Sequence, residues 1–218
     1  MSITLEKISP EIGVYISAEH RFGTDAVLLA EFADPRKTDK AVDLGTGCGI
    51  IPMLWCRTMN FSSAVGVEIS ESAASLAKRT AEEYSGGKVE IVNADMRKIE
   101  EYLPREKFSL ACCNPPYFKK GSGKERAGEQ AVARHDSECT SADLAKAADY
   151  LLKYGGRLCV CQRPERLTDV LFALRERGLE PKVLRFVAKS NEAEPWLFLL
   201  EAKKGGRPGL KVLPVKIV

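Results

Sequence analysis

The residues best suited to chemistry are Asn114, Pro115, Pro116 and Tyr117, which stand in one run directly after the apolar segment 108–113. Each proline fixes its own φ and disfavours helical geometry in the residue before it, so the turn is stiff. The Asn114 amide and the two neighbouring carbonyls then point outward as acceptors, and an amine could bind there. Tyr117 adds a flat face on which a planar group could stack. Taken alone, an ordinary Pro-Pro turn with a buried tyrosine explains these four residues equally well.

A glycine loop and an acid follow two other apolar segments. Gly45, Gly47 and Gly49 come after 41–44 and would let a ligand approach the backbone closely. Glu68 ends the next apolar segment, where a carboxylate can accept both hydroxyls of a ribose. A nicotinamide fingerprint would require a further glycine at position 50, where this chain has isoleucine, so a nicotinamide cofactor is disfavoured.

Asp95 and Met96 follow a third apolar segment, 89–92. The carboxylate could accept a hydrogen bond from an adenine amine while the methionine packs on the ring. Taken singly, Asp95 could equally be a helix cap and Glu68 a solvated charge at a strand end. Candidate groups at four successive strand ends instead predict one shared ligand site, because ligands of open α/β sheets bind beyond the carboxyl ends of the strands.

The elements that must position these groups alternate along the chain. Strands are expected at 41–44, 64–68, 89–92, 108–113, 157–161, 182–188 and 196–200, and helices at 26–32, 50–57, 70–84, 97–103, 141–153 and 164–178. Thr24 or Asp25 is the expected N-cap of the first helix. This alternation predicts an α/β fold with an open, mostly parallel sheet. The last two strands are joined too closely for a crossover, so one of them should run antiparallel.

Composition narrows the class of protein. The 218 residues predict a single domain, with residues 1–39 as an N-terminal cap segment and 203–218 as a basic tail. A net charge of +3 predicts that any nucleic-acid surface is local. Seven cysteines without C-x-x-C spacing indicate reduced, mostly buried thiols and no metal site. The N-terminus carries no signal pattern, and no apolar run reaches the roughly 18 residues of a membrane span, so a cytoplasmic location is expected.

The whole set of motifs resembles the class I S-adenosylmethionine-dependent methyltransferases. The match narrows at the two ends of the chain. The segment from Phe22 to Ala30, the pair Arg134-His135 and the segment from Lys203 to Val212 are similar to the tRNA1(Val) (adenine(37)-N6)-methyltransferase family. The resemblance implies a Rossmann-like seven-stranded sheet with one antiparallel strand and helices on both faces. It also implies tRNA as substrate, and S-adenosylmethionine as a cofactor that leaves as S-adenosylhomocysteine.

The resemblance assigns roles residue by residue. It implies catalysis by Asn114, Pro115 and Tyr117, with the Asn114 side chain and the Pro115 carbonyl accepting the two N–H groups of adenine N6. Cofactor contacts are implied for Thr24, Asp25, Asp43, Gly45, Thr46, Gly47, Gly49, Glu68, Ile69, Asp95, Met96 and Asn114. Thr24 and Asp25 could instead merely begin the first helix.

Two basic clusters are candidates for contact with RNA phosphates. Their members are Lys119, Lys120, Lys124, Arg126, Arg134, Lys204 and Arg207. Charge runs on loops are more often solvated surface, and a lone histidine such as His135 is more often structural than functional.

Three other functions remain compatible with the sequence. A protein glutamine N5-methyltransferase would use the same amide chemistry, but release-factor enzymes of that type carry a helical N-terminal domain, and only 40 residues precede Ala41 here. An amino-methyltransferase for DNA or ribosomal RNA is the second, although there is little room for a DNA target-recognition domain. A non-catalytic RNA-binding or cofactor-sensing module is the third, and it would not need Asn114, Asp43, Glu68 and Asp95 together.

Overall fold

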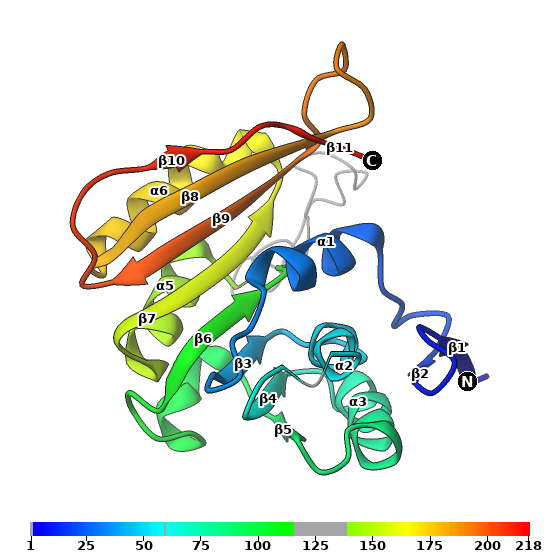
Figure 1. The fold of residues 1–218 in the computed structure, drawn as a ribbon. Coiled ribbons are helices and arrows are strands. Elements are labelled where there is room, and N and C mark those ends of the chain that lie inside the picture. The colour runs from blue at the N-terminus through cyan, green and yellow to red at the C-terminus, as the bar shows by residue number, and fades with distance from the viewer. Residues whose placement is uncertain (1, 59, 116–138) are drawn as a thin grey trace, which may run out of the picture.

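A twisted sheet with helices packed on both faces forms the centre of the molecule (Figure 1). The structure is a computed structural model, and it describes residues 2–58, 60–115 and 139–218. The strands are β1 (Thr4–Lys7), β2 (Gly13–Ile16), β3 (Lys40–Leu44), β4 (Ser63–Glu68), β5 (Val89–Asn93), β6 (Phe108–Cys113), β7 (Leu152–Gln162), β8 (Leu179–Ala188), β9 (Leu197–Lys204), β10 (Lys211–Val212) and β11 (Lys216–Ile217). The helices are α1 (Thr24–Ala33), α2 (Ile50–Cys56), α3 (Glu71–Tyr84), α5 (Ser141–Leu151), α6 (Leu167–Glu176) and the short η1 (Met96–Glu101) and η2 (Pro164–Arg166).

The sheet runs in the order β10-β8-β9-β7-β6-β3-β4-β5, and β11 also pairs with β8. Neighbouring strands are parallel except where β9 lies antiparallel between β7 and β8. The predicted seven-stranded sheet with one antiparallel strand is therefore confirmed for β3 to β9. The described C-terminal residues add the two short strands β10 and β11, which brings this sheet to nine strands.

Strand residues alternate between two hydrophobic clusters, one on each face of the sheet. Val42 and Leu44 pack with α5 and α6, whereas Ala41 packs on the opposite face with α1 and α2. On β6 the adjacent Cys112 and Cys113 likewise divide between the two faces. This alternation follows from the period of two in a β-strand and explains why both faces require helices. All seven cysteines are free, and six are buried, as the sequence predicts.

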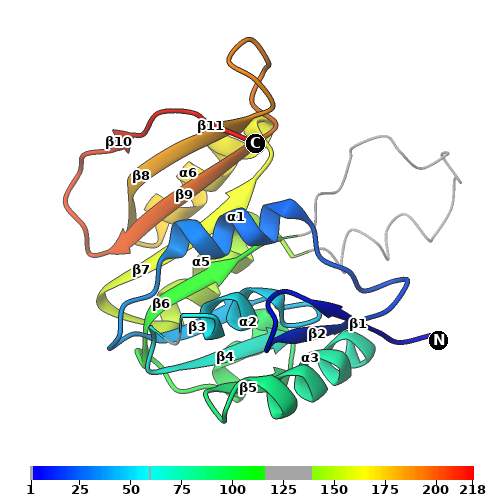
Figure 2. The same ribbon diagram turned by 45° about the vertical axis from the view of Figure 1, so that its right-hand side comes forward.

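The N-terminal segment forms a separate two-stranded hairpin, β1 with β2, that lies against α3 (Figure 2). The backbone N–H of Tyr15 donates to Thr80 Oγ1 at 3.0 Å, and the Tyr15 hydroxyl donates to Glu83 Oε2 at 2.7 Å. Both contacts fasten the hairpin to the helix that follows β4.

Two local details differ from the expectation. β7 begins at Leu152, so Gly155 and Gly156 lie inside this strand and not between the expected helix 141–153 and the expected strand 157–161. The strand accommodates them because the register of β6 against β7 shifts there and Gly155 adopts a φ of +79°. The N-cap of α1 is Gly23, with no side-chain cap, so neither Thr24 nor Asp25 caps that helix.

The basic tail also differs from the expectation. Lys203 and Lys204 end β9, and the chain then returns along the sheet edge as β10 and β11.

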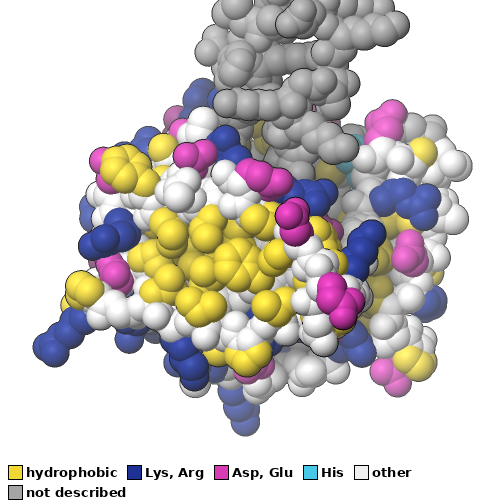
Figure 3. Space-filling view, turned by 90° about the horizontal axis from the view of Figure 1, so that it is seen from above, with side chains coloured by type: hydrophobic (Ala, Val, Ile, Leu, Met, Phe, Trp, Pro, Cys, Tyr) yellow, Lys and Arg dark blue, Asp and Glu magenta, His cyan; other side chains and the backbone are white. Residues whose placement is uncertain are grey.

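Exposed apolar side chains gather on this part of the molecule: Phe172, Leu210, Val212, Val215, Ile217 and Val218. Figure 3 looks down on it and shows a broad hydrophobic patch. None of the helices in the described ranges is long and apolar enough to cross a membrane.

One arginine joins the end of α1 to three strands. The Arg157 guanidinium, whose side chain is 12% exposed, pairs with Asp39 at 3.2 Å and with Glu201 at 3.0 Å. It also donates to the carbonyls of Ala33 and Asp34 at 3.1 and 3.3 Å. Burial alone would raise the pKa of Asp39, but hydrogen bonds from the Ser109 hydroxyl and a backbone amide, together with the charge of Arg157, lower it.

Replacing this arginine tests the network. Arg157→Ala should lower the free energy of unfolding by about 3–5 kcal/mol, because the buried Asp39 carboxylate would lose the cation that neutralises its charge. The measurement is urea unfolding followed by circular dichroism. The matched control is Arg105→Ala, whose exposed pair with Glu106 spans 3.7 Å, and it should change stability by less than about 1 kcal/mol. Equal losses in the two variants would contradict the network.

Candidate functional site

The carboxyl ends of three central strands stand level with one another. Leu44 at the end of β3 is paired with both Val67 on β4 and Cys113 on β6. The glycine loop therefore begins beside Glu68 on one side and Asn114 on the other. The structure thus brings these predicted groups to one edge of the sheet, as the strand-end argument required.

The glycine loop and Glu68 hold each other in place. Gly45 and Gly47 have φ values of +76° and +57°, which favour glycine over residues with a side chain. The backbone N–H of Gly47 donates to Glu68 Oε2 at 2.8 Å, and that of Ser70 donates to Oε1 at 2.9 Å. Each carboxylate oxygen retains a further lone pair for a ligand hydroxyl. The apolar side chain of Ile69, 60% exposed, follows directly.

Asp43 is the most unusual group in the site. Its side chain is fully buried, and neither carboxylate oxygen has a hydrogen-bond partner among the described residues. Burial raises the pKa of Asp43 to about 7, and the negative charge of Glu68 adds to this rise. The nearby Thr46 hydroxyl lowers the pKa in part, although it does not meet the geometry of a hydrogen bond. Thr46 Oγ1 is itself buried and without a partner in the described chain. Such groups fit a ligand that brings positive charge and hydrogen-bond donors.

Asp95 has partners of its own. It is the N-cap of η1 and accepts a hydrogen bond from the backbone N–H of Arg97 at 2.9 Å. The Arg97 guanidinium also forms an ion pair with the Asp95 carboxylate at 2.7 Å. Hydrogen bonding from Arg97 lowers the pKa of Asp95 and keeps it ionised. The helix-cap interpretation is thus confirmed, whereas the adenine contact stays a prediction. Met96 lies near the glycine loop, since a Cβ added to Gly45 would stand 3.7 Å from Met96 Cε.

Asn114 is held from two sides. Its Nδ2 donates to Asp25 Oδ2 at 2.9 Å, and the Cys161 thiol donates to its Oδ1 at 3.1 Å. The sequence predicted neither contact as such, although it named Asp25 for a different role. The only available indication of Cys161 was its place near the end of a strand, and the pairing of β6 with β7 was needed to bring it beside Asn114.

Tyr117, Lys119, Lys120, Lys124, Arg126, Arg134 and His135 lie outside the described residues. Pro115 follows Asn114 and is partly exposed. Thr24 is exposed at the first turn of α1, and Gly49 is the N-cap of α2.

The C-terminal basic residues lie at the other end of the sheet. Lys204 stands five positions beyond Leu199 on β9, and Leu199 pairs with Cys161, the neighbour of Asn114. At about 3.4 Å per residue, the five positions along β9 separate Lys204 from the level of Asn114 by roughly 17 Å. Arg207 is exposed at the same end, where its carbonyl accepts the Lys182 ammonium at 2.8 Å.

Lys204 has a structural role in place of the predicted RNA contact. Its ammonium, on a side chain 13% exposed, donates to the carbonyls of Asp149 and Leu152 at 2.6 and 2.9 Å. It also pairs with the carboxylates of Glu106 and Asp149 at 3.2 and 3.1 Å. A lysine ammonium has three donors, so these contacts leave no donor for a phosphate.

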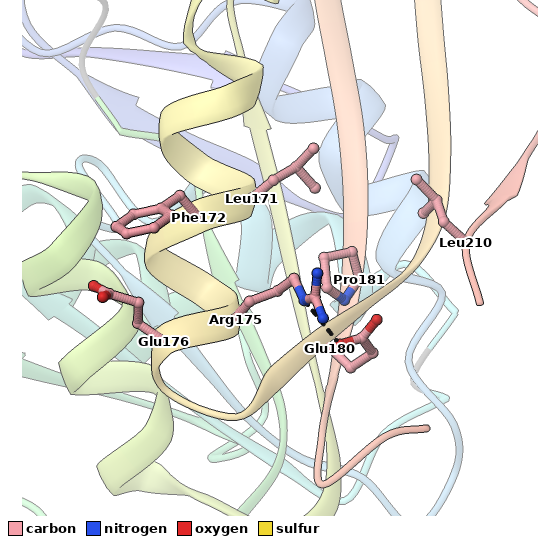
Figure 4. Close-up of a pocket in the computed structure, with 7 residues that line it drawn as sticks. All are labelled: Leu171, Phe172, Arg175, Glu176, Glu180, Pro181 and Leu210. Atoms are coloured by element: carbon pink, nitrogen blue, oxygen red, sulfur yellow. Dashed lines mark ion pairs between the residues drawn. The ribbon is translucent and has the colours of Figure 1, made fainter. Parts of the chain in front are cut away.

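A hollow of about 600 Å³ opens elsewhere, between α6 and the start of β8 (Figure 4). It is lined by Leu171, Phe172, Arg175, Glu176, Glu180, Pro181 and Leu210. Arg175 and Glu180 close one side with an ion pair at 3.3 Å. Because β8 begins level with Lys204, this hollow lies at the sheet end opposite the candidate site.

Comparison with known proteins agrees with this geometry. Residues 6–174 match the model of the methyltransferase small domain family. The chain belongs to that family. The expectation of a class I methyltransferase whose cofactor is S-adenosylmethionine is therefore confirmed.

Relatives of this methyltransferase carry a more specific name. A Pedobacter heparinus protein called tRNA1(Val) (adenine(37)-N6)-methyltransferase is 30% identical over 80% of this chain and 73% of its own length. A Parabacteroides distasonis protein of the same name is 27% identical over 83% of this chain and 76% of its own. The alignment with a third protein so named, from a Flavobacteriaceae bacterium, is 28% identical and spans 64% of this chain but only 58% of that relative.

Solved structures share the fold. An Agrobacterium tumefaciens protein described as a predicted O-methyltransferase superposes with a TM-score of 0.69 at 26% identity, covering 88% of this chain and 86% of that one. Thermus thermophilus TrmN superposes with a TM-score of 0.58 at 20% identity, over 82% of this chain and 48% of that one. The second likeness shows the fold alone.

The raised pKa of Asp43 makes a pH-dependent prediction. A carboxyl with a raised folded pKa favours folding at low pH, and this contribution is lost as the pH rises from about 4 to about 7. Asp43→Asn removes that loss, so the variant should gain stability relative to the natural protein as pH increases, with the largest difference above pH 7. Urea unfolding without cofactor at pH 5 and pH 8 measures the difference. A difference that does not change with pH would contradict the buried charge.

Proposed function

We propose that this methyltransferase transfers a methyl group from S-adenosylmethionine to the exocyclic N6 of adenosine in tRNA, at adenine 37 of tRNA1(Val). The observation that carries the proposal is the Asn114 carboxamide, held at the end of β6 beside the glycine loop. A carboxamide followed by Pro115 presents acceptors suited to an N–H group. The names of the relatives support the choice of nucleotide.

The chain's own residues would hold the cofactor at the edge formed by β3 and β4. The buried carboxylate of Asp43, which has no hydrogen-bond partner among the described residues, suits a cationic amino group. Glu68, fixed by two backbone N–H groups, would accept ribose hydroxyls, and Ile69 would offer its exposed apolar surface to the adenine ring. Asp95 and Met96 would lie on the other side of the adenine ring of the cofactor. When bound, the cofactor supplies an electrophilic methyl group on a sulfonium sulfur.

Asn114 and Pro115 would prepare the nitrogen that is methylated. The lone pair of an adenine amine is delocalised into the ring, which makes it a poor nucleophile. Two carbonyl oxygens that accept its N–H groups would favour a pyramidal nitrogen and stabilise the positive charge that develops there. Positioning contributes as well, since near-attack geometry can supply about 7–11 kcal/mol in favourable cases.

The RNA would approach over the strand ends. Stacking on Tyr117 and phosphate contacts from Lys119, Lys120, Lys124, Arg126 and Arg134 belong to this proposal. Of the two C-terminal candidates, exposed Arg207 is retained as a distant contact and Lys204 is not. A tRNA-modifying activity of this kind would act in the cytoplasm.

The substrate is tested with total tRNA from cells that lack this modification. Incubation with labelled S-adenosylmethionine, nuclease digestion and nucleoside mass spectrometry should show N6-methyladenosine next to the anticodon of one valine tRNA. Label in a protein fraction would instead favour glutamine methylation, and label in ribosomal RNA or DNA would favour those substrates. A 2′-O-methylated nucleoside would show that the methyl group is transferred to a ribose oxygen and not to adenine N6.

The role of Asn114 is tested by substitution. Asn114→Ala should lower kcat by about 100-fold or more, because an acceptor of the developing charge is lost. The dissociation constant of S-adenosylmethionine, measured by titration calorimetry, should change by less than about threefold, which is under 1 kcal/mol. A variant with near-normal turnover contradicts the role, and one that fails to fold would identify Asn114 as a turn former instead.

A further inference from the structure

The chemistry of Asn114 depends on which way its amide is turned. An asparagine carboxamide is planar, and rotation by 180° exchanges its oxygen for its NH₂ group. In one orientation the amide oxygen faces the substrate and can accept a hydrogen bond from its N–H group. In the other orientation the amide NH₂ group faces the substrate N–H group, and two donors cannot form a hydrogen bond. The hydrogen-bond partners of the amide decide between them.

Asp25 determines the orientation, because an ionised carboxylate can only accept hydrogen bonds. Its Oδ2 lies 2.9 Å from Asn114 Nδ2, so the NH₂ group must face Asp25. On the other side of the amide, the Cys161 thiol donates to Oδ1 at 3.1 Å. Both contacts favour the same orientation, and a carbonyl oxygen with two lone pairs can accept a second donor beside the thiol.

The N-terminus of α1 is built to place this carboxylate. Asp25 lies in the first turn of the helix, where the backbone dipole favours negative charge. Gly23 makes room for it, since a Cβ added at position 23 would stand 2.5 Å from Asp25 Oδ1. Because the N-cap is a glycine, the helix has no side-chain cap, and the Asp25 carboxylate in its first turn faces Asn114 instead.

We propose that Asp25 is a positioning residue that acts through Asn114. It holds the amide oxygen toward the nitrogen to be methylated, and its charge polarises the amide so that the oxygen becomes a stronger acceptor. The effect on turnover rests on the proposed function, whereas the orientation of the amide does not. This role differs from the cofactor contact that the family resemblance implies for Asp25.

Substitutions at Asp25 and at the neighbouring Gly23 test the proposal. Asp25→Ala should lower kcat about 10- to 100-fold, the range for losing a hydrogen bond to a charged group. Asp25→Asn keeps an oxygen acceptor and should recover part of that loss. Gly23→Ala keeps the carboxylate but displaces it, so its kcat should also fall. Glu31→Ala is the matched control, because Glu31 is on the same helix but forms an exposed pair with Lys216 at 2.7 Å.

A double-mutant cycle separates a role through Asn114 from a direct contact with the cofactor. If Asp25 acts through Asn114, Asp25→Ala should cost less than about threefold in kcat when Asn114→Ala is already present. The dissociation constant of S-adenosylmethionine should be unchanged in Asp25→Ala. If the losses in kcat of the two single variants multiply in the double variant, and cofactor binding is weakened in Asp25→Ala, the proposal is overturned in favour of a direct contact between Asp25 and the cofactor.

The orientation itself is read without any substrate. In ¹⁵N-labelled protein, the side-chain NH₂ signals of Asn114, assigned by their loss in Asn114→Ala, should shift in Asp25→Ala and Gly23→Ala but not in Glu31→Ala. Signals that stay in place in Asp25→Ala would overturn the proposal. If the natural protein methylates no tRNA while the signals shift as expected, the proposed substrate fails and the orienting contact stands.

Discussion

The parallel register of β3, β4 and β6 is the constraint on which the rest of the site depends. Because Leu44 is paired with both Val67 and Cys113, the glycine loop, Glu68 and Asn114 begin at the same level. None of these groups is close to the others in sequence. A shift of one residue in any of the three strands would move a side chain to the opposite face of the sheet and take it out of the site.

The two most buried carboxylates among the described residues lie in opposite environments. Asp39 accepts hydrogen bonds from the Ser109 hydroxyl and the Arg36 backbone N–H and pairs with Arg157, and this network stabilises the junction of α1 with the sheet. Asp43 is more deeply buried but has no hydrogen-bond partner in the described chain, and its pKa is raised to about 7. An uncompensated group of this kind costs stability, which is expected where a binding site requires it.

α1 joins these two regions. Its C-terminal carbonyls accept hydrogen bonds from Arg157. Its N-terminal Asp25 reaches Asn114, which is 89 positions away in the chain. The helix that covers one face of the sheet therefore also reaches the end of β6, so an element before the glycine loop takes part in positioning the group after it.

By itself, the sequence determined the order of strands and helices from β3 to β9, the fact that one of the last two of these strands is antiparallel, and the strand ends where Glu68 and Asn114 stand. These depend on local patterns: the alternation of apolar residues, the glycines and the prolines. Other features were decided only by the tertiary structure. Lys204 became a structural cation, Gly155 a bulge within β7, and Asp25 a partner of Asn114. Each depends on which residues the strand register places side by side, and that is a long-range property that no local pattern encodes.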